Sequence, residues 1–460
     1  MNRPQVALAT LIETREDFRR QREPYVREEL EALGWLRESA EVLESEPIAS
    51  ASQVQAFASK VRASEAQALI VHIPVWTDPV LTVKLSAIID LPKLLLGNSR
   101  PETSSTVGLL GAGGALDQIG VFHRRVFDHR RSDEQRCVVA FGRAAAAANR
   151  LKGQTLGLFG GRSLGIATAS ADPAQWQQVF GVDIEPLDQQ EIVGLAGTLP
   201  DGEVERHLNW LVEKLGEVQF GGRFTRAGLE RQVRSYLATR RLVARRGLDF
   251  VGVKCQPELS DGYATQCVAH MLINGQLDAD GEKPAIVHAC EADADGALTM
   301  QILHLLSGGS PTALLDMRWL DTANGVWTLA NCGAIPAAFV ATAKDGSGLS
   351  GVRMVPHVFG RGGGGALPMV VGVQQVTLAR LCRRKREYWM AVLPGQVEER
   401  NAAQLAYTTA AFPQAFVKTM AGEDFLQMFG SNHIHMVSGD LVPELKSFCA
   451  LKGIECHLWD

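Results

Sequence analysis

The chain has 460 residues, of which 46% are hydrophobic and 21% are charged, and its formal net charge at pH 7 is −5. This length is typical of roughly two to four domains, and the composition is that of an ordinary globular protein. The negative net charge gives no electrostatic reason to expect nucleic acid as a partner, and no apolar run is long enough to predict a membrane span.

The first third of the chain is predicted to alternate strands and helices. The N-terminal apolar stretch breaks into charged residues too soon for a signal peptide, so it reads as a first strand. A charged segment running through Leu43 has helical character, and an Ala-rich helix ends near Leu151. Alternation of this kind indicates a parallel sheet covered by helices. The apolar runs that predict strands lie at 5–12, 68–76, 92–98 and 106–114.

A second round of alternation follows, with an Arg-rich helical region at 223–246. Helices are predicted at 262–275 and 296–306, the second with a regular apolar face. The helices separate apolar runs in a βαβαβ pattern, which again favours a parallel sheet. The runs that predict strands lie at 154–160, 182–188, 250–255, 284–290 and 312–317.

Beyond residue 340, glycine-rich turns separate segments in which polar and apolar residues alternate. This pattern indicates a smaller β-rich domain. The chain closes with a strand at 433–437, a helix at 441–452 and a strand at 454–459. The predicted fold class is α/β, with two doubly wound parallel-sheet domains followed by a smaller β-rich C-terminal domain. The predicted domains are 1–152, 153–340 and 341–460.

The eight cysteines include no C-x-x-C pair and no zinc-site spacing. Most of them lie in apolar segments, as buried reduced thiols do. A cytoplasmic protein is therefore expected.

The segment HACEADADGALTM at 288–300 places Glu291, Asp293 and Asp295 at alternate positions before a glycine. This pattern approaches a calcium-binding loop, but that loop needs a glutamate at its twelfth position, where this chain has Ile302. Because isoleucine cannot bind a metal, the calcium-loop interpretation fails.

Strand ends suggest a different site. Glu291 follows the predicted strand at 284–290 and Asp316 follows the one at 312–315, so both are expected on the carboxyl edge of one parallel sheet, where the strand before Lys254 also ends. His433 and His435 are two positions apart on a later predicted strand, so their side chains share one face. The residues alone do not decide which of the two is the metal ligand. Two carboxylates and an imidazole suit Mn²⁺ or Mg²⁺ better than zinc.

Plainer roles are expected for the neighbouring polar residues. Asp295 is predicted to be the N-cap of the helix that follows. Asp293 is predicted to be a cap or a group behind the metal ligands rather than a ligand. His304 and His435 are predicted to serve packing or hydrogen bonding.

Five segments resemble the L-fucose isomerase family, which is related to L-arabinose isomerase. They are KCQPELSDGYATQC, CEADADGALTMQILHLLSGG, LLDMRW, ANCG and GSNHIHMVSGD. The resemblance covers residues 250–335 and 412–440. It implies that Glu291, Asp316 and His433 are metal ligands, with Mn²⁺ as the usual metal, and that the two carboxylates also transfer the proton. It further implies a homotrimer or homohexamer in which the first domain of a neighbour helps to close the pocket.

The implied reaction is aldose–ketose isomerisation, catalysed by an intramolecular oxidoreductase, of a fucose-like or arabinose-like sugar. A proton moves between C1 and C2 through an ene-diolate, which needs two acid–base groups within reach of both carbons. Asn331 stands where relatives closer to arabinose isomerase tend to have histidine, which leaves a three-ligand site. Candidate substrate-binding residues are Trp76 from the neighbouring subunit, Gln118, Gln414 and Asn432, with His123 as a further candidate.

Two alternatives remain open. The first is a sugar-binding or regulatory relative that keeps the fold without turnover. The second is a nicotinamide-dependent oxidoreductase that uses the glycine-rich loops at 108–120 and 157–165, although the first loop lacks the third glycine of a dinucleotide fingerprint. Either loop also fits phosphate binding at a helix N-terminus or a tight turn.

Overall fold

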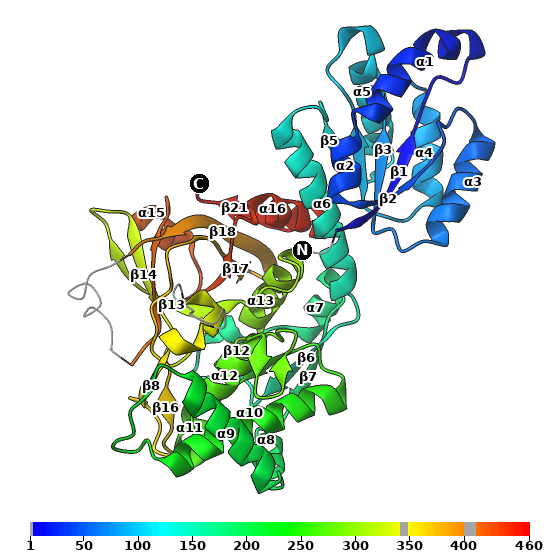
Figure 1. The fold of residues 1–460 in the computed structure, drawn as a ribbon. Coiled ribbons are helices and arrows are strands. Elements are labelled where there is room, and N and C mark those ends of the chain that lie inside the picture. Colours follow the sequence, from blue (N-terminus) through cyan, green and yellow to red (C-terminus); the bar gives the residue numbers. More distant parts are fainter. Residues whose placement is uncertain (1–2, 341–347, 400–410) are drawn as a thin grey trace. The chain divides into compact units, whose positions relative to one another are not determined.

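The computed structural model describes residues 3–340, 348–399 and 411–460, which form two compact units (Figure 1). The first unit comprises Met1–Arg150 and Pro443–Gly453, and the second comprises Leu151–Val442 and Ile454–Asp460. Among the described residues, no helix is both long enough and apolar enough to cross a membrane.

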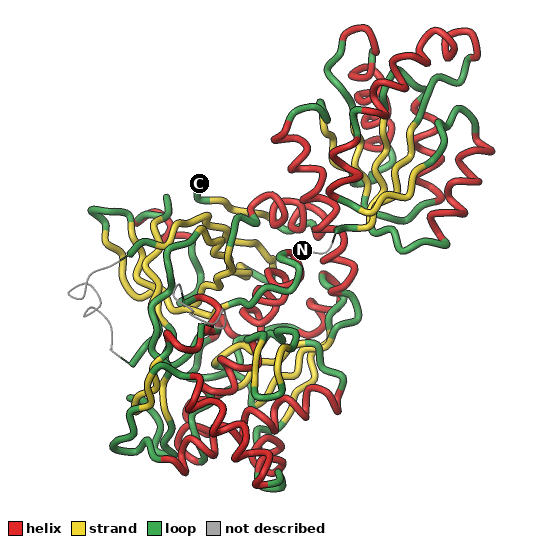
Figure 2. Tube along the Cα trace, viewed as in Figure 1, coloured by secondary structure: helices red, strands yellow, loops and turns green. Residues whose placement is uncertain are grey.

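The first unit is a parallel sheet with helices on both faces, as Figure 2 shows by its yellow strands between red helices. The strand order is β2-β1-β3-β4-β5, and every neighbouring pair is parallel. The strands are β1 (Gln5–Thr10), β2 (Glu41–Glu44), β3 (Ala68–His72), β4 (Lys93–Leu96) and β5 (His123–Val126). The helices are α1 (Glu16–Glu31), α2 (Gly34–Ser39), α3 (Ala51–Arg62), α4 (Pro79–Ile88), α5 (Ser105–Gln118), α6 (Ser132–Leu151) and α16 (Val442–Lys452).

Two local predictions for this unit are wrong. The run at 106–114 is not a strand but the body of helix α5, whose buried residues recur at helical spacing. A Cβ on Gly108 would lie 2.9 Å from Ile73 Cγ2, so this glycine allows α5 to approach the segment after β3 closely. The segment predicted to be helical through Leu43 instead ends in β2, because edge pairing with β1 outweighs its local preference.

The second unit begins with a four-stranded parallel sheet in the order β12-β9-β6-β7. Its strands are β6 (Thr155–Phe159), β7 (Asp183–Leu187), β9 (Phe250–Val253) and β12 (His288–Cys290). The helices of this part are α7 (Pro173–Val179), α8 (Gln190–Ala196), α9 (Asp201–Lys214), α10 (Arg226–Arg246), α11 (Ser260–Gly262), α12 (Cys267–Asn274) and α13 (Ala294–Leu306).

The rest of the second unit is built around a closed antiparallel barrel. The strand order β17-β20-β13-β14-β19-β18 returns to its start because β18 also pairs with β17, and β21 adds to the outside of β18. The strands are β13 (Ala313–Asp321), β14 (Val326–Ala330), β17 (Gln375–Arg384), β18 (Glu387–Val397), β19 (Gln414–Lys418), β20 (His433–Ser438) and β21 (Glu455–Leu458). Smaller elements are β8 (Glu217–Val218), β10 (Leu277–Asp278), β11 (Gly281–Glu282), β15 (Arg353–Pro356), β16 (Gly365–Ala366) and α15 (Glu423–Met428).

One prediction that matters for the site is wrong, and the barrel shows why. The run at 312–317 was expected to be the next strand of the parallel sheet, but it is β13, antiparallel to both β14 and β20. Its first residues are buried and its later ones are half-buried or exposed, a pattern typical of antiparallel strands that reach solvent and not of parallel strands covered on both faces. Strands β13 and β14 precede residue 340 and pair with strands that follow it.

Helix α13 lies between the two sheets of this unit (Figure 1). It contacts β9 and β12 of the parallel sheet, and β17 and β20 of the barrel. All but two of its residues are buried, which agrees with a helix that is covered on every side. The α/β fold class with a β-rich C-terminal part is confirmed. Within the second unit, α13 packs against both the parallel sheet and the barrel.

Candidate active site

Glu291 lies in a turn of unusual backbone conformation between β12 and α13. Glu291 has φ 59° and Ala292 has φ 50°, a left-handed region that residues with a Cβ seldom adopt. The Ala292 amide donates to the Val253 carbonyl at 3.1 Å, which holds the turn against the end of β9. The glutamate is thereby buried to 8% exposure at the point where the sheet meets α13.

Asp316 and His433 reach the same place from the barrel. They are directly opposite each other on the antiparallel strands β13 and β20. The Nε2 atom of His433 lies 3.4 Å from Glu291 Oε2 and 3.7 Å from Asp316 Oδ1. The structure therefore brings together the three residues that the sequence singled out, although Asp316 arrives on a different sheet from the one expected.

The other nitrogen of the His433 ring is already bonded. Nδ1 lies 2.7 Å from Asp293 Oδ2, and His433 is 1% exposed. Its Nε2 atom is buried and has no hydrogen-bond partner among the described residues. A buried nitrogen without a partner, facing two carboxylates, fits a divalent metal ion. Two oxygen donors and one imidazole suit Mn²⁺ or Mg²⁺.

The surroundings of the site change the pKa values of His433 and Asp316. Burial disfavours the charged imidazolium of His433, but its hydrogen bond to Asp293 and the nearby carboxylate of Glu291 outweigh burial and raise its pKa to about 10. Burial raises the pKa of Asp316, and the nearby charge of Glu291 adds to that effect against the opposing influence of His433. A carboxyl group with a raised pKa at a partly open position is suited to proton transfer.

Comparison with known proteins identifies the family of the chain. A model of the L-fucose isomerase C-terminal domain matches residues 329–459, and a model of the first N-terminal domain of L-fucose isomerase matches residues 26–153. The chain belongs to the L-fucose isomerase family. The C-terminal match contains His433, while Glu291 and Asp316 lie between the two matched regions.

Curated relatives in this family carry two names. The chain is 20% identical to a sulfoquinovose isomerase from Priestia aryabhattai over 93% of this chain and 94% of the relative. It is 23% identical to a sulfoquinovose isomerase from Clostridium sp. (strain MSTE9) over 80% of this chain and 78% of the relative. It is 22% identical to an L-fucose isomerase from Salmonella paratyphi B over 57% of this chain and 50% of the relative. The chain is accordingly an enzyme of the aldose–ketose isomerase class, an intramolecular oxidoreductase.

Of the predicted substrate-binding residues, Asn432 contacts the site, and Gln414 is two strands from Asp316 because both are in register with Ala330. Asn432 precedes His433, and its Nδ2 atom donates to Asp316 Oδ1 at 3.1 Å. Gln414 on β19 is 5% exposed, and its Oε1 atom has no hydrogen-bond partner among the described residues. Asn331 donates to the Leu314 carbonyl and accepts from the Gly333 and Ala334 amides, so its side chain shapes the loop after β14.

The remaining substrate candidates belong to the first unit. Trp76 is half-buried after β3, and the guanidinium of Arg15 lies 5.2 Å from its ring centroid. Gln118 is exposed at the end of α5, and His123 begins β5 with Nδ1 2.9 Å from the Val121 carbonyl. Their approach to the site of a neighbouring subunit stays a prediction. Arg15 was not among the candidates, although its place after β1 puts it at the same carboxyl edge as Trp76.

Of the two aspartates for which a capping role was predicted, Asp293 and not Asp295 caps α13. Asp293 is the N-cap, because its Oδ1 accepts from the Gly296 amide at 2.9 Å. Asp295 is 2% exposed and accepts from the Tyr388 hydroxyl and the Arg383 guanidinium, both at 2.9 Å. The prediction of Asp295 as the cap is therefore wrong. Because Asp293 already accepts the Gly296 amide, Asp295 is left to bond the side chains that cover it.

The two other histidines make the contacts expected of packing residues. His435 is fully buried, with Nδ1 3.3 Å from the Ala379 carbonyl of the neighbouring strand. His304, near the end of α13, has Nδ1 2.9 Å from the Ser310 carbonyl. Neither has a contact with Glu291 or Asp316 among the described residues.

The glycine-rich segments do not form dinucleotide loops. Residues 108–118 lie inside helix α5, so this segment cannot be the turn between a strand and a helix. The segment after β6 leads into a 3₁₀ turn at Ala167–Ala169 instead of a helix with an open N-terminus. The nicotinamide alternative loses the structural basis it had in the sequence.

A second carboxylate–histidine group lies away from the site. His207, Asp278 and Asp280 offer ligand atoms within 4.8 Å of one another. Arg240 donates to both aspartates at 2.8 Å, and Arg206 donates to Asp280 at 2.7 Å. The two arginines neutralise the two carboxylates, so this group has less attraction for a cation than the site at Glu291.

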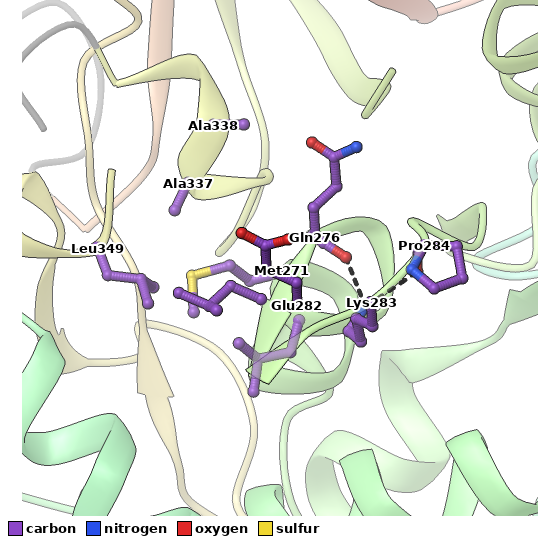
Figure 3. Close-up of a pocket in the computed structure, with 11 residues that line it drawn as sticks. Met271, Gln276, Glu282, Lys283, Pro284, Ala337, Ala338 and Leu349 are labelled. Carbon is purple, nitrogen blue, oxygen red and sulfur yellow. Dashed lines mark hydrogen bonds between the residues drawn. The ribbon is translucent and has the colours of Figure 1, made fainter. Parts of the chain in front are cut away.

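The second unit also contains a cavity of about 760 Å³ (Figure 3). Its walls come from α12, the β10–β11 hairpin and the segments around Ala337 and Leu349. Lys283 and Glu282 are the charged residues of its lining, and the Lys283 amide donates to the Gln276 carbonyl at 2.9 Å (Figure 3). Glu291, Asp316 and His433 are absent from its lining. The cavity therefore lacks the convergent acid–base groups that the isomerase chemistry requires.

Proposed function

We propose that this chain is a metal-dependent aldose–ketose isomerase in which Glu291, Asp316 and His433 hold Mn²⁺ or a similar divalent ion. The observation that supports this most directly is the convergence of two carboxylates on the buried, unpartnered Nε2 atom of His433. When bound, such an ion supplies Lewis-acid stabilisation of the negative charge that develops on the two reacting sugar oxygens.

The two carboxylates are proposed to move the proton. Asn432 holds Oδ1 of Asp316, and Oδ2 has no hydrogen-bond partner among the described residues, which leaves it available to exchange a proton with the substrate. Burial raises the pKa of Asp316, which suits this carboxylate to take a proton from carbon. Glu291 faces it across His433 and is proposed to serve the other carbon.

The substrate is proposed to be an aldose of the size of a hexose. Sulfoquinovose isomerases match the chain over up to 93% of its length, against 57% for the L-fucose isomerase. Sulfoquinovose is therefore the first sugar to test, followed by L-fucose and L-arabinose. A homotrimer or homohexamer with Trp76 and Gln118 at a neighbour's site, and a cytoplasmic location, complete the proposal.

The decisive experiment follows the hydrogen on C2. Metal-loaded enzyme is incubated with each sugar in D₂O, and the ketose product is examined by proton NMR. Conversion with deuterium from solvent at C1 of the ketose supports an ene-diolate between two acid–base groups. A sugar-binding relative without turnover would bind one of these sugars and leave all of them unconverted.

A further inference from the structure

Arg380 is a fully buried cation in the middle of strand β17. Its side chain is 1% exposed, and it is among the largest fully buried side chains of the described residues. Burying a guanidinium is costly unless a counter-ion and hydrogen bonds offset the lost hydration. This position in the barrel wall therefore requires a carboxylate beside it.

The counter-ion is Asp293, which is 0% exposed. Both terminal nitrogens of Arg380 bond this carboxylate: Nη1 reaches Oδ2, and Nη2 lies 3.1 Å from Oδ1. Nη2 also donates to the Thr168 carbonyl at 2.7 Å, which fixes the guanidinium plane from the other side. The paired bonds set the rotation of the Asp293 carboxylate as well as its charge.

The same carboxylate orients a residue of the metal site. Asp293 Oδ2 lies 2.7 Å from His433 Nδ1, while Oδ1 accepts the Gly296 amide at 2.9 Å. Asp293 is thus held by β17, by the first turn of α13 and by β20. A hydrogen on Nδ1, donated to Asp293, leaves the Nε2 lone pair directed toward Glu291 and Asp316.

We propose that Arg380 is a positioning residue of the metal centre, which acts through Asp293 to fix the ring orientation and tautomer of His433. Without Arg380, Asp293 would lose the paired bonds that set the rotation of its carboxylate, and it could turn away from His433 Nδ1. That rotation would remove the acceptor that holds the His433 ring. The inference rests on the proposed metal-dependent function and assigns a role to a residue 53 positions before His433 in the chain.

The first turn of α13 is shaped around this ion pair. A Cβ on Gly296 would lie 2.5 Å from Asp293 Oδ2 and 2.7 Å from Arg380 Nη1. Any larger residue there would push the carboxylate away from the guanidinium. Glycine costs roughly 1 kcal/mol relative to alanine inside a helix, and here the missing side chain leaves the space that the pair occupies.

The test measures metal affinity rather than activity alone. Arg380→Met removes the charge and keeps most of the volume, and Arg380→Lys keeps the charge without the paired bonds. The matched control is Arg383→Met on the same strand, because Arg383 pairs with Asp295, which does not touch His433. Mn²⁺ dissociation constants are measured by isothermal titration calorimetry. The ¹⁵N shifts of His433 in the Mg²⁺-loaded protein report its tautomer.

We expect Arg380→Met to weaken Mn²⁺ binding about 10–100-fold and to change the His433 tautomer signal, because such losses are typical when a group behind a metal ligand is removed. Arg380→Lys should recover part of that affinity, and Arg383→Met should stay within about threefold of wild type. Equal losses in Arg380→Met and Arg383→Met, or wild-type affinity in Arg380→Met, would overturn the proposal.

A second variant covers the case in which Arg380→Met does not fold. Gly296→Ala keeps both charges and displaces Asp293 by steric contact, so it should also weaken Mn²⁺ binding, and an unchanged dissociation constant counts against the proposal. If wild-type protein binds no divalent metal, the proposed function fails. If wild-type protein binds metal and the variants bind it equally well, only the role of Arg380 fails.

Discussion

Asp316 and His433 face each other across the antiparallel strands β13 and β20, and His433 Nε2 lies 3.7 Å from Asp316 Oδ1. Directly opposed residues of an antiparallel pair have side chains about 5 Å apart, so the sheet register alone places these two groups together. Glu291 joins them from the turn before α13, the helix that packs on both sheets. The geometry of the site therefore depends on the register of β13 and β20 and on the packing of α13.

Removal of divalent metal should abolish isomerisation. Enzyme treated with a chelator and dialysed is expected to be inactive, and Mn²⁺ should restore turnover better than Zn²⁺, because two of the three proposed ligands are carboxylates. The measurement is the initial rate on the best sugar against added metal. Full turnover by enzyme shown by mass spectrometry to be metal-free would contradict the proposed mechanism.

Replacing either carboxylate by its amide should stop proton transfer. Glu291→Gln and Asp316→Asn keep the side-chain shape and remove the basic group, so each should lower kcat by at least about a hundredfold. Circular dichroism should show that both variants fold. The control is Glu282→Gln, an exposed carboxylate in the β10–β11 hairpin, which should keep wild-type kcat. A near wild-type rate in either site variant would remove that residue from the catalytic assignment.

The two histidines of β20 should differ in their effect on metal content. His433→Ala is expected to lose bound Mn²⁺ at micromolar metal, because it removes a ligand. His435→Ala should retain it and lose at most about 10–100-fold in affinity, because His435 bonds the Ala379 carbonyl. Mass spectrometry after dialysis measures the metal in each variant. The reverse order would move the ligand to His435.

Asn432→Ala should lower turnover without removing metal. The variant loses the hydrogen bond that holds Asp316 Oδ1 at 3.1 Å, so the carboxylate can rotate away from the reacting carbon. We expect kcat to fall about tenfold, within the range of effects from a misplaced acid–base group, with Mn²⁺ content unchanged. Loss of metal together with activity would show that Asn432 supports the ligand set instead.

The first unit should become less stable in acid through Glu29. Burial opposes ionisation of this glutamate, but hydrogen bonds from His129, Arg130 and Arg100 lower its pKa from 4.5 to about 2. A depressed pKa contributes stability that is fully present above the unfolded value and is lost as pH falls from about 4.5 toward about 2. The contribution at neutral pH is on the order of 3 kcal/mol.

The variant Glu29→Gln tests this pH dependence. Its melting temperature should lie below that of wild type at neutral pH, and the gap should close as the pH is lowered through that window. Glu23→Gln on the same helix is the control, since Glu23 is 68% exposed and should leave the melting temperature unchanged. A gap that stays constant with pH would mean that packing, not charge, accounts for the role of Glu29.

The sequence by itself determined much of the local structure and singled out the candidate site residues. Periodicity and strand-end position marked Glu291 and Asp316, because apolar runs and the charges that end them are local properties of the chain. The choice of His433 over His435 came from the resemblance of the Asn-His pair to the family. The run at 106–114 shows the limit of this reasoning, since a glycine-rich apolar segment fits a strand or a buried helix equally well.

Only the tertiary structure decided how the site is built. A short apolar run such as 312–317 does not reveal whether its neighbours will be parallel or antiparallel, so β13 could not be assigned to the barrel in advance. The pairing of Arg380 with Asp293 joins residues 87 positions apart, and no local pattern predicts which buried cation will meet which carboxylate. Those partners are set by sheet register and helix packing, which depend on the whole second unit and not on any one segment of its sequence.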